Sequence, residues 1–359
     1  MHFFSKVLKR IKVLFYKSLA TLKVKLLIFS KPQKKLLILK IDSIGDYILF
    51  RNFILEVKTA TKYKDYHITL CGNMWWRELA EKLDANAVDH FIWIDYFKLE
   101  NWSYKYAIAQ QILKNNFETI LHPTYSRDLY SDELVKYSGV KNCIGYNGDY
   151  LNTPKNIRDK FDVYYSRLID GDKGIVFEFY RNKYFFESVL EKKLDGIKPF
   201  IPAPASNEHS IIICPGAKDV ARQWGTLKFI DLIQYIHNKE PQTPILLCGS
   251  KSEESIGMEI NKALDNTLEN IIGKVTLGEL IDVFASAKLI VTNDSGPFHL
   301  AVALNKKVIC ISNGTNFMRF SPYPKELNTT SKVIYAVEGQ IAEISKVEVS
   351  SVLNAIYND

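Results

Sequence analysis

Apolar and polar positions follow two recurring patterns along the chain from about residue 35 onward. Short runs rich in Ile, Leu and Val, such as residues 36–41 and 211–214, are typical of buried strands. Longer stretches with apolar residues three or four positions apart, such as residues 226–239, indicate amphipathic helices. Strands that alternate with helices predict βαβ units and parallel sheets with helices on both faces.

This alternation occurs twice, and a less regular region of about 60 residues separates the two series. Pro199, Pro202 and Pro204 lie close together near the end of that region, which is typical of a linker. The chain has 359 residues, enough for two separate cores. We therefore expect an N-terminal α/β domain over residues 34–200 and a C-terminal α/β domain over residues 201–359. Because parallel sheets bind ligands at the carboxyl ends of their strands, two such domains are expected to face a cleft.

Residues 1–33 precede the first domain and have a helical pattern of their own. Steps of three or four residues place one apolar stripe along a helix, formed by Phe4, Leu8, Ile11, Phe15, Leu19, Leu22, Leu26 and Phe29. The lysines lie mostly on other faces, as in a helix that lies on a membrane surface. No uncharged run is long enough for a membrane span or a signal peptide. Packing on the protein body, packing on a partner helix and binding of nucleic acid remain alternatives.

The charge distribution supports treating this segment separately. The chain has a formal net charge of +7, and residues 1–41 hold eleven Lys or Arg and no Asp or Glu. The remaining residues hold 36 basic and 40 acidic side chains, so the two domains together are mildly acidic. Attraction to a polyanionic surface is therefore expected only at the N-terminal segment.

The five cysteines do not indicate a metal site or disulfides. There is no CxxC pair and no neighbouring histidine that would complete a zinc site. Most lie in apolar runs, which favours buried thiols in a reducing compartment.

The most informative motif in the second half is residues 290–304, which predicts a strand, a tight turn and a helix. Asp294, Ser295 and Gly296 form the turn, and Pro297 suits the first turn of the helix. The helix start, with its N–H groups and dipole, favours a phosphate. The alternative is that Asp294 or Ser295 only caps the helix. His299, taken alone, is typical of a packed helix residue.

A second strand end, after residues 211–214, carries cationic residues. Gly216 permits a close turn, and Lys218 and Arg222 follow it. Arg222 is suited to grip a phosphate with two nitrogen atoms. A solvated surface charge is the preferred interpretation of Lys218.

Other nucleotide-binding and metal-binding signatures are absent from the sequence. There is neither GxxxxGK[ST] nor GxGxxG, which argues against a P-loop ATPase and a dinucleotide oxidoreductase. The triplet Asp170, Gly171 and Asp172 is interpreted as a turn rather than a metal site.

Three stretches together resemble glycosyltransferase family 9, the family of ADP-heptose:lipopolysaccharide heptosyltransferases. They are "ILKIDSIGDYILFRNFI", "IIICPGAKDVARQWGTLKFIDLI" and "ELIDVFASAKLIVTNDSGPFHLAVALNKKVICISNGT", within residues 35–325. The D-[ST]-G-x-x-H stretch of the third is the most specific. The resemblance implies a GT-B fold, with two Rossmann-like domains and an inverting, metal-independent sugar transfer from a nucleotide diphosphate.

The resemblance also assigns roles to individual residues. Asp46 matches the proposed base that deprotonates the acceptor hydroxyl; capping of a helix by Asp46 or Asp42 is the alternative. Arg222 stands where heptosyltransferases usually have Lys, and the usual G-P-[ST] appears here as "NGT". The residues expected at the donor are Gly216, Arg222, Asp294, Ser295, Gly296, His299, Asn313 and Gly314. No metal or other cofactor is implied.

The leading hypothesis is therefore a glycosyltransferase that builds a lipid-linked glycan such as the lipopolysaccharide core. Its expected partners are a nucleotide sugar, which the resemblance suggests is ADP-heptose, a lipid-linked saccharide acceptor, and an anionic membrane surface bound through residues 1–33. Nucleic acid is not expected. The expected location is cytoplasmic, peripheral on the inner face of the cytoplasmic membrane. The alternative is a non-catalytic GT-B-like module that binds a nucleotide sugar or a protein partner.

Overall fold

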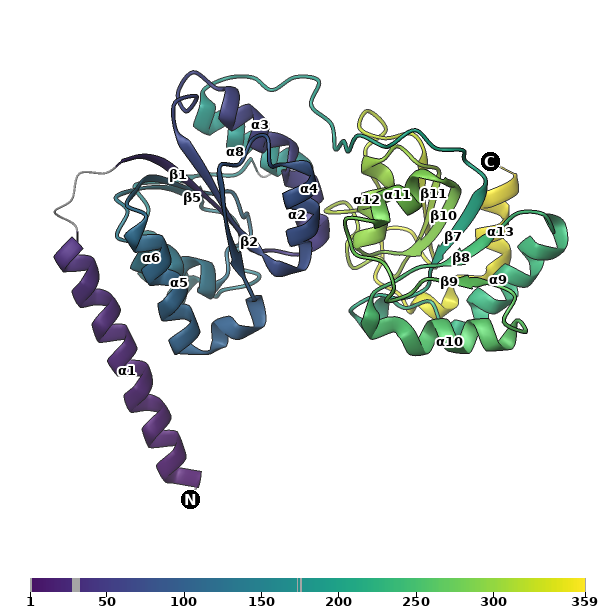
Figure 1. Cartoon of the computed structure of the whole chain (residues 1–359), viewed down its shortest axis with the longest axis horizontal. Helices are drawn as coiled ribbons and strands as arrows, with labels where there is room; N and C mark the ends of the chain where they lie inside the picture. The colour runs from purple at the N-terminus through teal and green to yellow at the C-terminus, as the bar shows by residue number, and fades with distance from the viewer. Residues whose placement is uncertain (1, 28–32, 173, 175, 359) are drawn as a thin grey trace. The chain divides into compact units, whose positions relative to one another are not determined.

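The structure is a computed structural model, which describes residues 2–27, 33–172, 174 and 176–358. The side chains of residues 2–9 and 24–27 lie outside the described part. The chain divides into two compact units (Figure 1). Unit 1 comprises Met1–Ser43, Phe53–Ile175 and Tyr180–Asp195. Unit 2 comprises Ile44–Asn52, Val176–Phe179 and Gly196–Asp359.

Unit 1 contains a six-stranded parallel sheet with the order β3-β2-β1-β4-β5-β6. Its strands are β1 (Gln33–Lys40), β2 (His67–Asn73), β3 (His90–Ile94), β4 (Phe117–His122), β5 (Asn142–Tyr146) and β6 (Arg167–Ile169). In the central strands, β1 is buried from Leu36 onward and β4 at every position except Glu118, as the continuous apolar run over residues 36–41 predicts.

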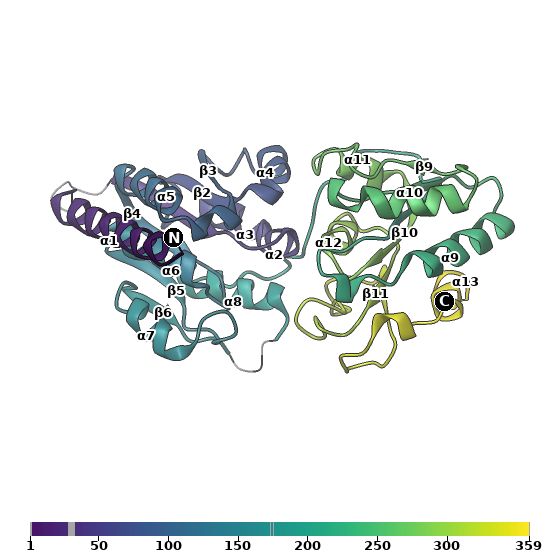
Figure 2. The ribbon, with the colours of Figure 1, turned by 90° about the horizontal axis from the view of Figure 1, so that it is seen from below.

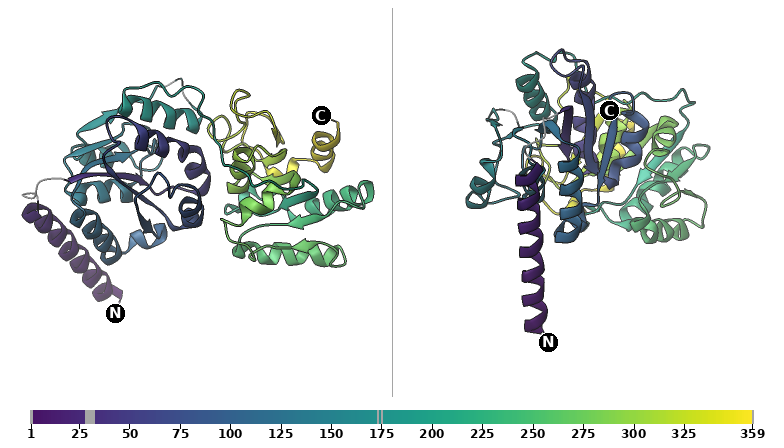
Figure 3. Two further views of the ribbon diagram at one scale, coloured as in Figure 1. Left: turned by 45° about the horizontal axis from the view of Figure 1, so that its top comes forward. Right: turned by 60° about the vertical axis from the view of Figure 1, so that its left-hand side comes forward.

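Helices cover both faces of this sheet (Figure 3). They are α3 (Asn52–Thr59), α4 (Arg77–Leu83), α5 (Trp102–Lys114), α6 (Leu129–Ser138), α7 (Lys155–Asp162) and α8 (Glu178–Leu190). On one face, α5 and α6 bury apolar side chains against Leu37, Leu39 and Ile120. On the other, α3 and α8 meet through the stacked rings of Phe53 and Phe186, whose centroids are 5.3 Å apart.

Unit 2 contains a second six-stranded parallel sheet, with the order β12-β11-β10-β7-β8-β9. Its strands are β7 (Ser210–Cys214), β8 (Ile245–Leu247), β9 (Glu269–Asn270), β10 (Ala287–Asn293), β11 (Val308–Ser312) and β12 (Ser331–Tyr335). Every residue of β7 and β11 is buried, because helices pack on both sides of the sheet.

The helices of unit 2 separate into two layers (Figure 2). They are α2 (Ile44–Phe50), α9 (Thr226–Lys239), α10 (Glu254–Ala263), α11 (Leu280–Ala285), α12 (Gly296–Ala303) and α13 (Val349–Tyr357). Side chains from α9, α10 and α13 pack on one face of the sheet, against Ile213, Val291 and Ile311. α11 and α12 contact β10, and α2 packs directly on α12. α2 therefore belongs to unit 2, although the chain segments that precede and follow it in the sequence belong to unit 1.

The first helix of the chain, α1 (His2–Leu27), packs against α5 and α6 of unit 1. No helix in the described part of the chain is long and apolar enough to cross a membrane. The prediction of an α/β fold with two parallel sheets is confirmed.

Candidate active site

Three neighbouring strands of the unit 2 sheet, β7, β10 and β11, end at the loops that carry the predicted donor residues. Gly216 and Arg222 follow β7, residues 294–299 follow β10, and Asn313 and Gly314 follow β11. Because parallel strands all end at the same edge of a sheet, the topology brings these loops together. Asp46 lies in the first turn of α2, which packs on α12 within the same unit.

The loop after β7 is held in place by a side chain that the sequence analysis overlooked. The buried amide of Asn293 donates to the carbonyl oxygens of Pro215, at 2.7 Å, and Gly216, at 3.2 Å. Its Oδ1 accepts the N–H of Trp224 at 3.2 Å. Gly216 also lies close to Glu253, because a Cβ on Gly216 would come within 2.1 Å of Glu253 Oε1. A larger residue at position 216 would require the Glu253 side chain to move.

Arg222 ends a short 3-10 turn, Val220–Arg222, which Asp219 caps by accepting the N–H of Ala221. Its Nη1 donates to the backbone carbonyl of Asp294 at 3.2 Å, and its Nε lies 3.8 Å from the Asp219 carboxylate. The side chain is 26% exposed. The guanidinium is therefore anchored beside the β10 turn and still reaches solvent, as an anion-binding arginine must.

Asp294 is fully buried and connects three loops. Its Oδ2 accepts hydrogen bonds from Ser312, at 2.8 Å, and Ser321, at 3.2 Å. Its Oδ1 has no hydrogen-bond partner among the described residues. The carboxylate therefore points into the protein. Its hydrogen bonds hold the loops after β10 and β11 in place relative to each other.

The first turn of α12 begins at Gly296, with Ser295 in extended conformation at the N-cap position. The Ser295 hydroxyl makes no capping bond to the helix and instead lies 3.3 Å from the carbonyl of Asn293. Gly296 lies against Ile44 of α2, because a Cβ there would be 3.2 Å from Ile44 Cγ2. The helix start is partly exposed, and its amides and dipole favour a bound anion.

His299 is buried, and its ring is fixed on both sides. Its Nδ1 lies 2.8 Å from the Tyr323 hydroxyl, and its Cδ2 would be 2.6 Å from a Cβ on Gly45. Burial lowers the pKa of His299 to about 4; Asp294 opposes this effect and Arg222 reinforces it. The imidazole is thus neutral near pH 7 and packs directly beside the residue that precedes Asp46.

The loop after β11 is tied to the loop that carries Arg222. Asn313 donates to the carbonyl of Ala221 at 3.0 Å, and its Oδ1 accepts the N–H of Thr315 at 3.1 Å. Gly314 has a φ of +84°, and a Cβ there would lie 2.1 Å from the Gln340 carbonyl oxygen. This position therefore requires glycine.

The site includes residues that sequence reasoning missed: Asn293, Ser312, Ser321, Tyr323 and Gly45. Asn293 and Ser312 gave a weak signal, since each is a polar residue at the carboxyl end of an apolar strand. Tyr323 and Ser321 lie more than 20 residues beyond the groups they contact, so no local pattern reveals them.

The acidic candidates for a metal site have other partners. Asp170 accepts from the Asn147 amide at 2.8 Å, and Asp172 accepts the N–H of Gly174 at 2.8 Å, as expected for turn residues. Within the described part of the chain, no group of three or more His, Cys, Asp or Glu could hold a metal ion.

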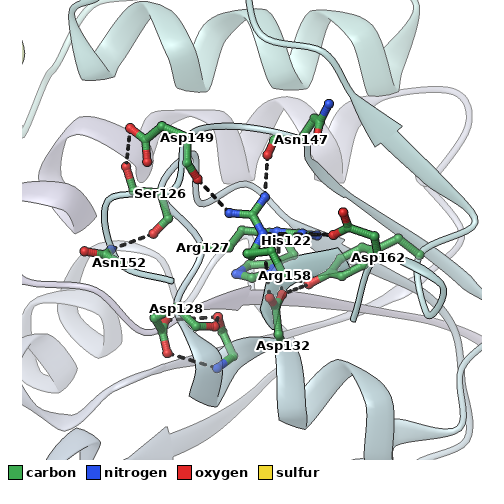
Figure 4. A network of polar contacts seen from close by, with 12 residues as sticks. His122, Ser126, Arg127, Asp128, Asp132, Asn147, Asp149, Asn152, Arg158 and Asp162 are labelled. Atoms are coloured by element: carbon green, nitrogen blue, oxygen red, sulfur yellow. Dashed lines mark hydrogen bonds and ion pairs between the residues drawn. The ribbon is translucent and has the colours of Figure 1, made fainter. Parts of the chain in front are cut away.

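Unit 1 has a polar cluster of a different kind (Figure 4). Arg127 and Arg158, both fully buried, lie beside the carboxylates of Asp132 and Asp162. Arg158 also donates to the carbonyl of Asp149 at 2.8 Å and to that of Asn147. Two positive and two negative side chains balance within the cluster, which stabilises the loop after β5 rather than presenting charge to a ligand.

The same cluster fixes the protonation of a buried histidine. The Tyr165 hydroxyl donates to Asp132 at 2.7 Å and therefore accepts the Nδ1–H of His122 at 2.8 Å. Burial, reinforced by Arg127, holds the pKa of His122 well below its ordinary value. Nearby, Asp42 at the end of β1 forms an ion pair with the buried Lys40 at 2.7 Å and accepts from Thr124. Asp42 is thus a structural carboxylate.

Comparison with known proteins connects the site to a family. Residues 177–343 match the family model of glycosyltransferase family 9 (heptosyltransferase). Lipooligosaccharide heptosyltransferase 2 of Haemophilus influenzae is 30% identical over 138 residues, which are 37% of this chain and 38% of that relative. The chain thus spans about two fifths of the length of this relative. The lipopolysaccharide core heptosyltransferase OpsX of the same organism is 22% identical over 85% of this chain and 86% of its own length.

A solved structure shows the same fold over most of the chain. The E. coli heptosyltransferase WaaC with ADP-2-deoxy-2-fluoro heptose superimposes with a TM-score of 0.69 and 18% identity, covering 90% of this chain and 99% of that one. The two parallel sheets thus define a GT-B fold. The resemblance that the sequence motifs indicated is confirmed, because the chain is similar to proteins of glycosyltransferase family 9 in sequence and in fold.

Proposed function

We propose that this protein is an inverting glycosyltransferase that moves a heptose from ADP-heptose to a lipid-linked saccharide such as the lipopolysaccharide core. The observation that carries the proposal is the arrangement within unit 2: three adjacent strand ends hold Arg222, the start of α12 and a glycine loop, and α2 with Asp46 packs on α12. The names of the similar proteins supply the sugar and the acceptor class.

In the proposed reaction, the acceptor hydroxyl oxygen attacks the anomeric carbon of the donor sugar. The bond from that carbon to the diphosphate oxygen breaks, and the nucleoside diphosphate leaves with the electron pair. Asp46, which is partly exposed, takes the proton of the hydroxyl. Attack from the face opposite the leaving group inverts the anomeric configuration.

The leaving group needs positive potential, which the protein can supply without a metal. Arg222 offers a fixed guanidinium, and the start of α12 at Gly296 offers backbone amides and the positive end of the helix dipole. Gly216 and Gly314 lie in the loops that follow the two neighbouring strands, and we expect their backbone to contribute to the same donor site. We therefore expect transfer to continue in the presence of a metal chelator.

His299 would contribute by position rather than by charge. Because its pKa is about 4, the His299 imidazole is uncharged near pH 7 and adds no positive charge to the proposed diphosphate site. Its ring fills the space beside Gly45 and so fixes the first turn of α2, which carries Asp46. The buried Asp294 would support the diphosphate site through the loops it joins.

The test of this proposal is the Asp46→Asn variant, assayed for transfer from ADP-heptose to a lipopolysaccharide-core acceptor. A positioned base contributes about 10² to 10⁴ in rate, so we expect at least about a 100-fold loss of turnover with unchanged ADP affinity. Asp231→Asn, which changes an exposed acid on α9 of the same unit, is the matched control and should retain full turnover. Equal turnover in Asp46→Asn and wild type would exclude the proposed base.

A thermal-shift panel of ADP, UDP and GDP, each alone and as the sugar conjugate, tests the donor independently, because a ligand that binds the native state raises its apparent stability. Binding without any detectable transfer would favour the alternative of a non-catalytic nucleotide-sugar module.

A further inference from the structure

Helix α1 uses one narrow face to pack on unit 1. Ala20 is only 1% exposed and joins the apolar cluster that contains Ile108 and Ala109 of α5. One turn earlier, the ring of Tyr16 lies 5.5 Å from that of Tyr106. This face therefore fixes α1 against α5.

The opposite face of α1 is apolar and open to solvent. Ile11, Phe15 and Leu22 are 57%, 59% and 54% exposed. At about 100° per residue, these three positions fall within about 40° of one another, and Ile11 lies about 180° from Ala20. Leu14, at the side of this group, is also exposed. We call Ile11, Leu14, Phe15 and Leu22 the outer face of α1. A packed helix normally turns its apolar stripe inward, so this orientation needs a partner.

Cationic side chains lie on both sides of the outer face. Lys12 and Lys23 are exposed on one side, and Arg10 is exposed on the other. Lys17 bends back over the Trp102 ring at 4.8 Å, on the packed side. Residues 1–41 contain no Asp or Glu, so nothing on this segment offsets the positive charge. The predicted stripe positions Phe4, Leu8, Leu26 and Phe29 lie outside the described side chains.

We propose that the outer face of α1 inserts into the headgroup region of an anionic lipid bilayer, while the Ala20 face remains docked on α5. An apolar face with cationic side chains on both sides suits a surface that is apolar below and negatively charged at the headgroups. Nucleic acid would leave this face without a partner, and a second copy would bring like charges together. The proposal concerns α1 alone and is independent of the transfer chemistry, although it would bring the enzyme to a lipid-linked acceptor.

The test is co-sedimentation of the full-length chain with vesicles of phosphatidylcholine containing about one third phosphatidylglycerol. The triple variant Ile11→Ser, Phe15→Ser, Leu22→Ser removes three of the four apolar side chains of the outer face and leaves the Ala20 face unchanged. We expect its partition coefficient between vesicles and water to fall at least about tenfold. The matched control is Leu55→Ser, Leu227→Ser, Met258→Ser, which removes three exposed apolar side chains elsewhere and should bind as the wild type does.

A second pair of variants tests the charge. Arg10→Gln with Lys12→Gln should weaken binding about tenfold at low salt and less at high salt, because screening shortens the reach of the headgroup charge. Lys64→Gln with Lys262→Gln, at exposed positions outside α1, should have no effect. Equal binding of the wild type to pure phosphatidylcholine vesicles would overturn the proposal. So would a triple variant that retains vesicle binding but loses self-association in sedimentation equilibrium, since the partner would then be a second copy.

Discussion

The two units use arginine in opposite ways. In unit 1, Arg127 and Arg158 are fully buried and matched by two carboxylates. In unit 2, Arg222 keeps 26% of its side chain exposed beside two glycine-containing loops and the start of a helix. Breaking a buried pair is costly because it leaves an unpaired charge, whereas an exposed, anchored guanidinium retains donors for an incoming anion. Burial therefore separates arginines that stabilise a loop from an arginine that can bind a ligand.

The largest effect that would test this contrast is on stability, in the variant Arg158→Met. Losing the guanidinium leaves Asp132 with one ion-pair partner fewer and removes the hydrogen bonds to the carbonyls of Asn147 and Asp149. We expect the free energy of unfolding to fall by about 3 to 5 kcal/mol, measured by urea denaturation. Lys155→Met, at an exposed ion pair on the same helix, is the control and should leave the free energy of unfolding unchanged within the error of the measurement. Equal effects of the two variants would refute a structural role for the cluster.

A smaller effect, on binding instead of folding, is expected for Arg222→Met. In the proposed donor site Arg222 donates to the diphosphate, so we expect the dissociation constant of this variant for ADP to rise about 10-fold to 100-fold in calorimetry. Its free energy of unfolding without ligand should change by no more than about 1 kcal/mol, because only one weak bond to the Asp294 carbonyl is lost. Arg222→Lys should recover part of the affinity, and Lys262→Met on α10 serves as the neutral control. A strongly destabilised Arg222→Met with normal ADP binding would reverse the assignment.

The smallest expected effect is a change of pH dependence at the edge of the unit 1 cluster. Asp128 caps α6 by accepting the N–H groups of Tyr130 and Ser131. Burial, and then the nearby Asp42, raise the pKa of Asp128 to about 6. The native state therefore holds this proton more tightly than the unfolded chain, and the unfavourable effect of the ionised carboxylate develops as the pH rises through about 4 to 6.

Asp128→Asn retains an acceptor for the cap and cannot ionise. Relative to wild type, we expect the variant to gain about 1 to 2 kcal/mol of stability between pH 4 and pH 8, measured by urea denaturation at each pH. A constant difference between the two proteins across this range would show that Asp128 does not titrate there.

The spacing of apolar residues and the turn residues correctly predicted several individual helices and strands. The helix expected over residues 226–239 is α9, with the same bounds, and the strand, turn and helix around Asp294 are β10 and α12. These elements alternate strongly and have clear turn residues. The region after Asn147 lacked such a pattern, so α7, α8 and β6 were not predicted; α7 in particular is polar except for a few positions.

Long-range pairing explains what the sequence could not reveal. Arg127 and Arg158 are typical surface residues until Asp132 and Asp162 come close to them in the fold. In the same way, His299 contacts Gly45, more than 250 residues earlier, and Asp294 meets Ser321. The role of Asp46 remains a prediction, as do the donor roles of Gly216, Arg222, Asp294, Ser295, Gly296, His299, Asn313 and Gly314.

The assignment of α2 to unit 2 has a practical consequence for anyone who dissects this protein. The chain passes between the two units five times, so a cut near residue 196 does not release a complete half. A fragment that begins at Gly196 would lack Ile44–Asn52, including the side chains of Tyr47, Ile48, Leu49 and Phe50, all of which are buried. Expression of residues 196–359 alone would therefore expose the apolar surface of α12 that α2 covers. We expect that a co-expressed or fused copy of residues 44–52 is needed for this fragment to fold stably.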